Sequence, residues 1–276
     1  MDSSETFDIA LCQYELCDVG SFDALLERIA AGFDRAGTAD LYILPELFVN
    51  DYLEEIGTDD SIATLSSEEE TRFHDFLVTA ADRRNAVIVG GSYNIIDGDA
   101  IHNRCPISSP DSSIVTYDKS HLIPEERTCG KREGADLPPV IEHDGIGIGV
   151  AICYDVEFPD IIRGLANRGA EVVAVPSWTA EEAGYQRVSR CSAARAVENQ
   201  MYLAQVCLVG ARPDAGLSAT GRSTVFAPCD DIVGPHGTRL SLARDMDATG
   251  VCPVDISTLR KSRTDASVRP YTDSNR

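Results

Sequence analysis

Segments with the pattern of β-strands alternate with segments of helical spacing along most of this chain, and this order limits the folds open to it. Residues 6–14 and 39–46 are predicted strands, and residues 21–37 between them carry apolar side chains at the spacing of an amphipathic helix. Three further predicted strands follow one another without a helix between them, at 86–95, 101–108 and 113–120. This order favours a layered α/β sandwich over a simple doubly wound sheet, built as one domain over residues 1–276.

The ends of two predicted helices are marked by capping residues. Ser21 is placed to cap the first helix, and Gly37 is placed to end it. A second helix is predicted at 66–85, with Ser66 or Ser67 as its N-cap. Such residues satisfy backbone groups that have no partner inside the helix, so they indicate where each helix begins and ends.

The charge of the chain limits its partners. The formal net charge is −21, and only three lysines are present, Lys119, Lys131 and Lys261. A strongly negative surface repels phosphates, so we expect no nucleic-acid partner. An excess of acidic residues with few lysines resembles the halophilic surfaces of proteins from salt-loving microbes. In about 1 M salt, charges are screened within about 3 Å, so a dense negative surface is tolerated. Most acidic residues are then a solvated shell, whereas a lysine on an apolar segment needs an explanation.

The sequence predicts a cytoplasmic protein. It has no stretch long and apolar enough to be a transmembrane helix, and its N-terminus lacks the basic and apolar regions of a signal peptide, so we expect no membrane partner. The nine cysteines are scattered and form no C-x-x-C pair, so most are expected to be reduced, buried thiols. This pattern predicts neither a metal site nor a cofactor.

Three reactive side chains stand where apolar predicted strands end. They are Glu46 in "LYILPELF", Lys119 in "IVTYDKSHL" and Cys153 in "GVAICYD". Each has an ordinary alternative, since isolated glutamates and lysines are usually solvated and an isolated cysteine is usually a small hydrophobe. Together they can perform covalent catalysis: a thiol attacks, a carboxylate moves its proton, and an ammonium stabilises the anion that forms.

Two other interpretations of the Cys153 segment are weaker. A cysteine–histidine dyad has five candidate histidines, of which only His121 lies in a motif-like context. The glycines at 145–149 lie within a predicted strand, whereas a dinucleotide-binding loop follows a strand and opens a helix.

Four motifs of the sequence resemble the nitrilase superfamily of carbon-nitrogen hydrolases in order and approximate spacing. They are "LPELF", "YDKSHLIPEE", "ICYDVEFPD" and "RAVENQMY", and they span almost the whole chain. The resemblance implies a four-layer α-β-β-α sandwich and assembly into homodimers or larger homo-oligomers through the helical faces. Residues 177–199, which begin "SWTAEEAGY", and residues 267–273, "SVRPYTD", look most like a little-characterised, amidase-like branch in which some members are fused to an acetyltransferase domain.

The resemblance also implies roles for individual residues. Glu46 corresponds to the general base, Lys119 to the residue that stabilises the intermediate, and Cys153 to the nucleophile. A supporting glutamate usually stands seven positions after the lysine, which selects Glu126 over its neighbour Glu125. The backbone N–H of Tyr154 completes the oxyanion hole.

Other parts of the predicted site are less closely matched. Residues 127–134 read "RTCGKREG", whereas the family often carries an aromatic residue before Pro-Gly there. The motif therefore does not identify which residue forms the pocket wall at this point. Trp178, Tyr185 and Arg187 are candidates for lining the substrate pocket. The alternatives are that Trp178 packs over the core and that Arg187 pairs with a surface acid.

We expect a hydrolase that cleaves a non-peptide carbon–nitrogen bond of a small-molecule amide through a cysteine acyl-enzyme. A nitrilase acting on a nitrile uses the same three residues, so this alternative stays open. A non-catalytic binding or regulatory protein of the same fold, and an ammonia-producing domain that works with a separate synthetase, are further alternatives. The polar residues 258–276 are expected to form an irregular arm, either frayed or docked on a partner subunit.

Overall fold

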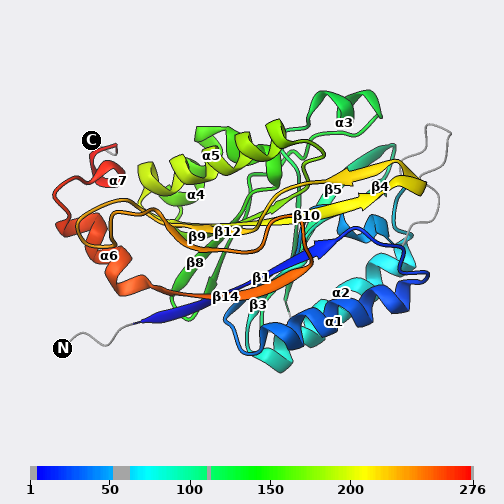
Figure 1. The fold of residues 1–276 in the computed structure, drawn as a ribbon, viewed down its shortest axis with the longest axis horizontal. Coiled ribbons are helices and arrows are strands. Elements are labelled where there is room, and N and C mark those ends of the chain that lie inside the picture. Colours follow the sequence, from blue (N-terminus) through cyan, green and yellow to red (C-terminus); the bar gives the residue numbers. More distant parts are fainter. Residues whose placement is uncertain (1–4, 52–62, 111–112, 275–276) are drawn as a thin grey trace.

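A computed structural model of the protein describes residues 5–51, 63–110 and 113–274. Two halves of a curled β-sheet form the middle of the molecule, and helices cover the outer face of each half (Figure 1). This is the predicted α-β-β-α sandwich. Among the described residues, no helix combines the length and apolar character needed to cross a membrane.

The first half of the sheet surrounds strand β1. Its strands are β1 (Thr6–Glu15), β2 (Leu41–Ile43), β3 (Val87–Val89), β4 (Tyr93–Asp97), β5 (Ala100–Ser108), β6 (Ile114–Asp118) and β14 (Ala248–Asp255). β1, β2 and β3 run parallel, whereas β4, β5, β6 and β14 add antiparallel pairs. Its outer face is covered by helices α1 (Phe22–Ala36) and α2 (Ser67–Arg84).

The second half joins the first through β1 and β10, which pair in parallel at Tyr14–Leu208 and Glu15–Val209. Its strands are β7 (Val140–His143), β8 (Ile146–Val150), β9 (Ala170–Ser177), β10 (Tyr202–Arg212), β11 (Leu217–Ala219), β12 (Thr224–Phe226) and β13 (Thr238–Ser241). Helices α4 (Pro159–Asn167) and α5 (Glu182–Asn199) cover its outer face (Figure 1). A one-turn helix, η3 (Pro213–Ala215), links β10 to β11.

Strand β1 shows how the sequence builds the layers. Successive side chains of a strand point to opposite faces. Ile9 and Leu11 belong to the central core between the sheet halves, whereas Ala10, Cys12 and Tyr14 pack with the residues of α1 and α2. Both faces of β1 are therefore buried, and each large side chain contributes about 1.5–3 kcal/mol by leaving water.

The predicted helix ends are confirmed. Ser21 accepts a hydrogen bond from the backbone N–H of Ala24, and Gly37 ends α1 with a φ of 73°. At α2 the structure selects Ser66 over Ser67 as the N-cap, because the Ser66 and Glu69 side chains accept hydrogen bonds from each other's backbone N–H. This reciprocal arrangement is a capping box.

The predicted strand at 86–95 is divided in two. β3 ends at Val89 and β4 begins at Tyr93, because the chain bends at Gly91, which has a φ of 68°. A Cβ atom on Gly91 would overlap the carbonyl oxygen of Pro45, which accepts a hydrogen bond from Ser92 N. The break therefore lets this segment approach the loop that carries Glu46.

The prediction of an irregular C-terminal arm is wrong for the described residues. Helix α6 (Ile256–Asp265) is capped by Asp255, and α7 (Pro270–Asp273) follows it. Both contact the same chain, since Arg263 donates a hydrogen bond to Gln200 O (2.8 Å) and Tyr271 donates one to Ala166 O (3.3 Å). The segment looked irregular because few of its residues are apolar, yet Leu259 is fully buried in the central core and Tyr271 packs against that core. Docking of this segment on a partner subunit stays a prediction.

Two helical glycines test how closely the helices pack on the sheet. A Cβ atom on Gly32 of α1 would overlap the buried hydroxyl of Tyr14, so we expect Gly32→Ala to lower the free energy of unfolding by about 1–3 kcal/mol. A Cβ atom on Gly164 of α4 would have nothing within 4 Å of it. Gly164→Ala is therefore expected to raise the free energy of unfolding by about 0.5–1 kcal/mol. Urea denaturation of both variants checks this pair, and a stabilised Gly32→Ala variant would contradict the packing described.

Candidate active site

The structure brings the three predicted catalytic side chains together. Glu46 follows β2, Lys119 directly follows β6 and Cys153 lies shortly after β8, so each side chain stands where the chain leaves the sheet. All three residues are buried, with exposed fractions of 2%, 2% and 6%. Their proximity was expected from the sequence, and their catalytic roles stay a prediction.

The ammonium group of Lys119 lies between two carboxylates. Its Nζ is 2.8 Å from Glu46 Oε1 and 2.8 Å from Glu126 Oε2. Glu126 lies in the short helix α3 (Pro124–Thr128), where its Oε2 also accepts a hydrogen bond from Ile123 N. Glu125 is exposed, so Glu126 is the glutamate of this pair that contacts the lysine, as predicted.

Two further polar residues complete this cluster, and sequence reasoning did not select either. Lys131 Nζ lies 3.2 Å from Glu126 Oε1. Asn103 of β5 donates hydrogen bonds to Glu46 Oε1 (2.9 Å) and Glu126 Oε1 (3.3 Å). The scarcity of lysine in the chain was a signal for Lys131, whereas no sequence signal distinguishes Asn103. The segment 127–134 therefore contributes a buried cation to the cluster, in the region where the family often carries an aromatic residue.

Opposite charges determine the protonation states within this cluster. Burial opposes the charged form of Lys119, but the carboxylates of Glu46 and Glu126 raise the pKa of Lys119 well above its ordinary value. Burial also opposes the charged form of Glu126, but Lys119 and Lys131 lower the pKa of Glu126 to about 2. Lys119 is therefore an ammonium and Glu126 a carboxylate at neutral pH.

The backbone at Cys153 has an unusual conformation. Cys153 has a φ of 45°, in the left-handed region, and begins the helical turn η2 (Cys153–Glu157). Its Sγ lies 3.6 Å from the carbonyl oxygen of Trp178, to which the thiol donates. Burial and the neighbouring Glu46 carboxylate raise the pKa of the Cys153 thiol well above its ordinary value, although Lys119 acts to lower it. The sulfur therefore carries its proton in the resting protein.

Asp155 connects the cysteine turn to the lysine loop. This fully buried carboxylate accepts hydrogen bonds from Tyr117 Oη (2.9 Å) and from His121 N (2.8 Å), which lie on either side of Lys119. It also accepts one from Ile152 N (3.2 Å), just before Cys153. One side chain therefore fixes the two loops relative to each other.

His121, the histidine of the alternative dyad, is engaged elsewhere. Its ring stacks on Phe158 with centroids 3.7 Å apart, and its Nδ1 lies 3.3 Å from Asp155 Oδ1. Tyr154, whose backbone N–H is the predicted oxyanion donor, follows Cys153 in η2, and its ring meets Phe158 edge-on at 5.0 Å. The rings at this turn pack with one another.

The predicted pocket residues differ in their surroundings. The backbone N–H of Trp178 donates a hydrogen bond to Glu46 Oε2 (2.9 Å), so Trp178 contacts the cluster through its main chain. Tyr185 is buried, whereas the side chain of Arg187 is 58% exposed and pairs with Glu157 (3.3 Å). The surface pairing considered for Arg187 is therefore present, and the roles of all three residues in substrate binding stay a prediction.

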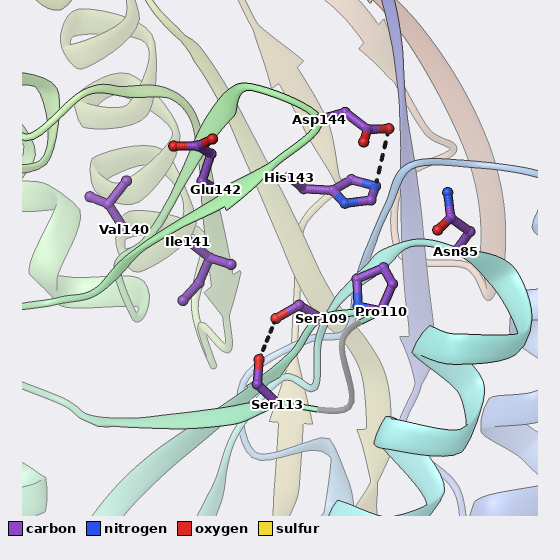
Figure 2. A pocket seen from close by; sticks show the side chains of 9 residues that line it. All are labelled: Asn85, Ser109, Pro110, Ser113, Val140, Ile141, Glu142, His143 and Asp144. Atoms are coloured by element: carbon purple, nitrogen blue, oxygen red, sulfur yellow. Dashed lines mark hydrogen bonds and ion pairs between the residues drawn. The ribbon is translucent and has the colours of Figure 1, made fainter.

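A separate surface hollow lies between the β7–β8 hairpin and the loop after β5. Figure 2 shows the ring of His143 directed toward Asp144, at 3.9 Å, and the hydroxyls of Ser109 and Ser113 in contact at 2.8 Å. The residues that line this hollow include none of the charged cluster around Lys119. It is thus distinct from the candidate active site.

Comparisons with known proteins agree with this architecture. A carbon-nitrogen hydrolase family model matches residues 8–261. The chain is 31% identical to the probable hydrolase YhcX of Bacillus subtilis over 98% of its own length, and it spans 54% of that protein. It is 30% identical to an (R)-stereoselective amidase of Pseudomonas sp., covering 83% of this chain and 78% of that one.

Solved structures of an amidase from Nesterenkonia sp. are also similar. In one, the match covers 100% of this chain and 97% of the amidase, with 26% identity and a TM-score of 0.72. Another structure of that amidase, carrying a glutamate-to-glutamine substitution, has acrylamide added to its active-site cysteine.

Asp155 can be tested through protein stability. An asparagine in its place directs an amide N–H₂ at buried donors, so we expect Asp155→Asn to lower the free energy of unfolding by about 2–3 kcal/mol. Tyr117→Phe removes one donor to this carboxylate and the acceptor of the Ser120 N–H (3.2 Å), and is expected to cost about 1–2 kcal/mol. Urea denaturation measures both, and a fully stable Asp155→Asn variant would show that the carboxylate does not fix the loops.

Proposed function

This chain belongs to the carbon-nitrogen hydrolase family, and from that premise we propose that it hydrolyses a small-molecule amide through a thioester on Cys153. One observation carries the proposal: a buried ammonium, Lys119, lies between two carboxylates beside a buried thiol. Amidases among the relatives support an amide as the substrate.

In the first half of the reaction, Cys153 Sγ attacks the amide carbonyl carbon while its proton passes to Glu46. Because burial keeps this sulfur protonated, a base is needed at the moment of attack. The negative charge moves to the carbonyl oxygen, where the Lys119 ammonium and the Tyr154 N–H stabilise it. Removing one such donor commonly costs about a hundredfold or more in rate.

Collapse of the tetrahedral intermediate breaks the carbon–nitrogen bond. The leaving amine takes the proton from Glu46, and the acyl group stays on the sulfur as a thioester. A water molecule then attacks the thioester carbon and gives its proton to Glu46, which returns it to the departing thiolate. The products are a carboxylic acid and ammonia or an amine, and the Lys119 ammonium is unchanged.

A nitrile is the alternative substrate, since the same thiol adds to a nitrile carbon to form a thioimidate. Glu46, Lys119 and Cys153 are all present in this chain, which favours catalytic turnover over a non-catalytic binding role. We also propose the cytoplasmic, salt-adapted setting and the homodimer or larger homo-oligomer expected from the sequence. The acidic composition supports the salt-adapted setting, and the family membership supports the homo-oligomer.

The proposal is tested by screening amides, N-carbamoyl amines and nitriles for release of ammonia or amine, in about 1 M salt because of the acidic surface. We expect an amide to be hydrolysed and Cys153→Ala to remove turnover, because the substitution removes the sulfur that forms the thioester. Cys229→Ala, which truncates an exposed cysteine, is the matched control and is expected to keep the wild-type rate. Hydrolysis of the same amide by Cys153→Ala at the wild-type rate would overturn the proposal.

A further inference from the structure

We propose that Lys131 is a positioning residue of this active site. Its ammonium balances the carboxylate of Glu126, and the charge of Lys119 thereby remains available to an anion that forms at Cys153. This inference rests on the proposed function, because it assigns Lys131 a part in the same covalent chemistry.

The contacts of Glu126 divide its two oxygens between two cations. Oε2 lies 2.8 Å from Lys119 Nζ, and Oε1 lies 3.2 Å from Lys131 Nζ. Lys131 is only 6% exposed, so water screens little of its charge. Each oxygen of this carboxylate therefore meets a different ammonium group.

The backbone holds Lys131 in place from several sides. Its N–H donates to Glu126 O (3.1 Å), and the next residue, Arg132, donates to Ile101 O of β5 (2.9 Å). Gly134 then donates to Lys119 O (2.9 Å), and a Cβ atom on Gly134 would overlap Asp118 O. The segment is thus fixed both to the sheet and to the loop that carries Lys119.

The formal charges of the cluster sum to zero only when Lys131 is counted. Glu46 and Glu126 contribute two negative charges, while Lys119 and Lys131 contribute two positive charges. Without Lys131, one ammonium would serve two buried carboxylates, and the cluster would carry an uncompensated negative charge. An anion on the sulfur or on the substrate oxygen would then form beside a net negative group, which disfavours it.

The position of the three lysines strengthens the inference. Two of the three in the chain lie in this buried cluster, in a protein whose other basic groups are almost all arginines. Lys261 is exposed on α6, outside the cluster. It offers a matched control, because the same substitution can be made in the same protein.

The test measures the reactivity of Cys153 toward iodoacetamide at one pH just above neutrality. Trypsin releases residues 133–163, which contain one cysteine, so mass spectrometry of this peptide reads Cys153 alone. We expect Lys131→Met to slow alkylation about tenfold, the effect of a one-unit rise in the thiol pKa. Lys131→Arg keeps the charge and should stay within about threefold of wild type, and Lys261→Met should match wild type.

A double variant separates charge balance from packing. Glu126→Gln combined with Lys131→Met removes one charge of each sign, so we expect alkylation to return to within about threefold of wild type. Wild-type alkylation in Lys131→Met would overturn the proposal, as would a double variant as slow as Lys131→Met. Alkylation needs no substrate, so a failed amide screen would count against the proposed function and leave this test of Lys131 intact.

Discussion

The ammonium of Lys119, held between the carboxylates of Glu46 and Glu126, is the interaction on which the rest of the candidate site depends. Buried charges are costly unless they are paired, and this lysine is paired on two sides at 2.8 Å. Glu46 is held further by Asn103 and by the backbone of Trp178. The cluster therefore fixes the carboxylates and the cation beside the thiol before any substrate binds, which limits reorganisation during the reaction.

The fold supplies this arrangement by ending several strands at one place. The bend at Gly91 admits the loop of Glu46, and Asp155 joins the loop of Lys119 to the turn of Cys153. The left-handed backbone conformation at Cys153 is energetically unfavourable, because non-glycine residues rarely adopt it. Hydrogen bonds to Asp155 and the packing of η2 hold the chain in that conformation.

Local signals predicted a layered α/β fold and the three reactive side chains after strands, whereas the four-layer arrangement and the choice of Glu126 came from the family resemblance. The alternating apolar residues of β1, the caps at Ser21 and Ser66, and the reactive side chains after strands are all visible in short windows. Asn103 and Lys131 were not selected, since their roles depend on contacts between segments far apart in the chain. The C-terminal helices were missed for a related reason, because their anchors are a few apolar side chains and hydrogen bonds that reach parts of the chain far away in sequence.

The central claim is that burial in this charged cluster keeps Cys153 as a thiol in the resting protein, so that Glu46 must take its proton during attack. The most direct measurement is the ultraviolet absorbance of the thiolate, recorded as the difference between wild type and Cys153→Ala during a pH titration. We expect no difference to develop between about pH 5 and about pH 8, because the thiol pKa lies above this range. A thiolate signal of Cys153 that is already present at about pH 6 would contradict the account and would favour a preformed ion pair at the sulfur.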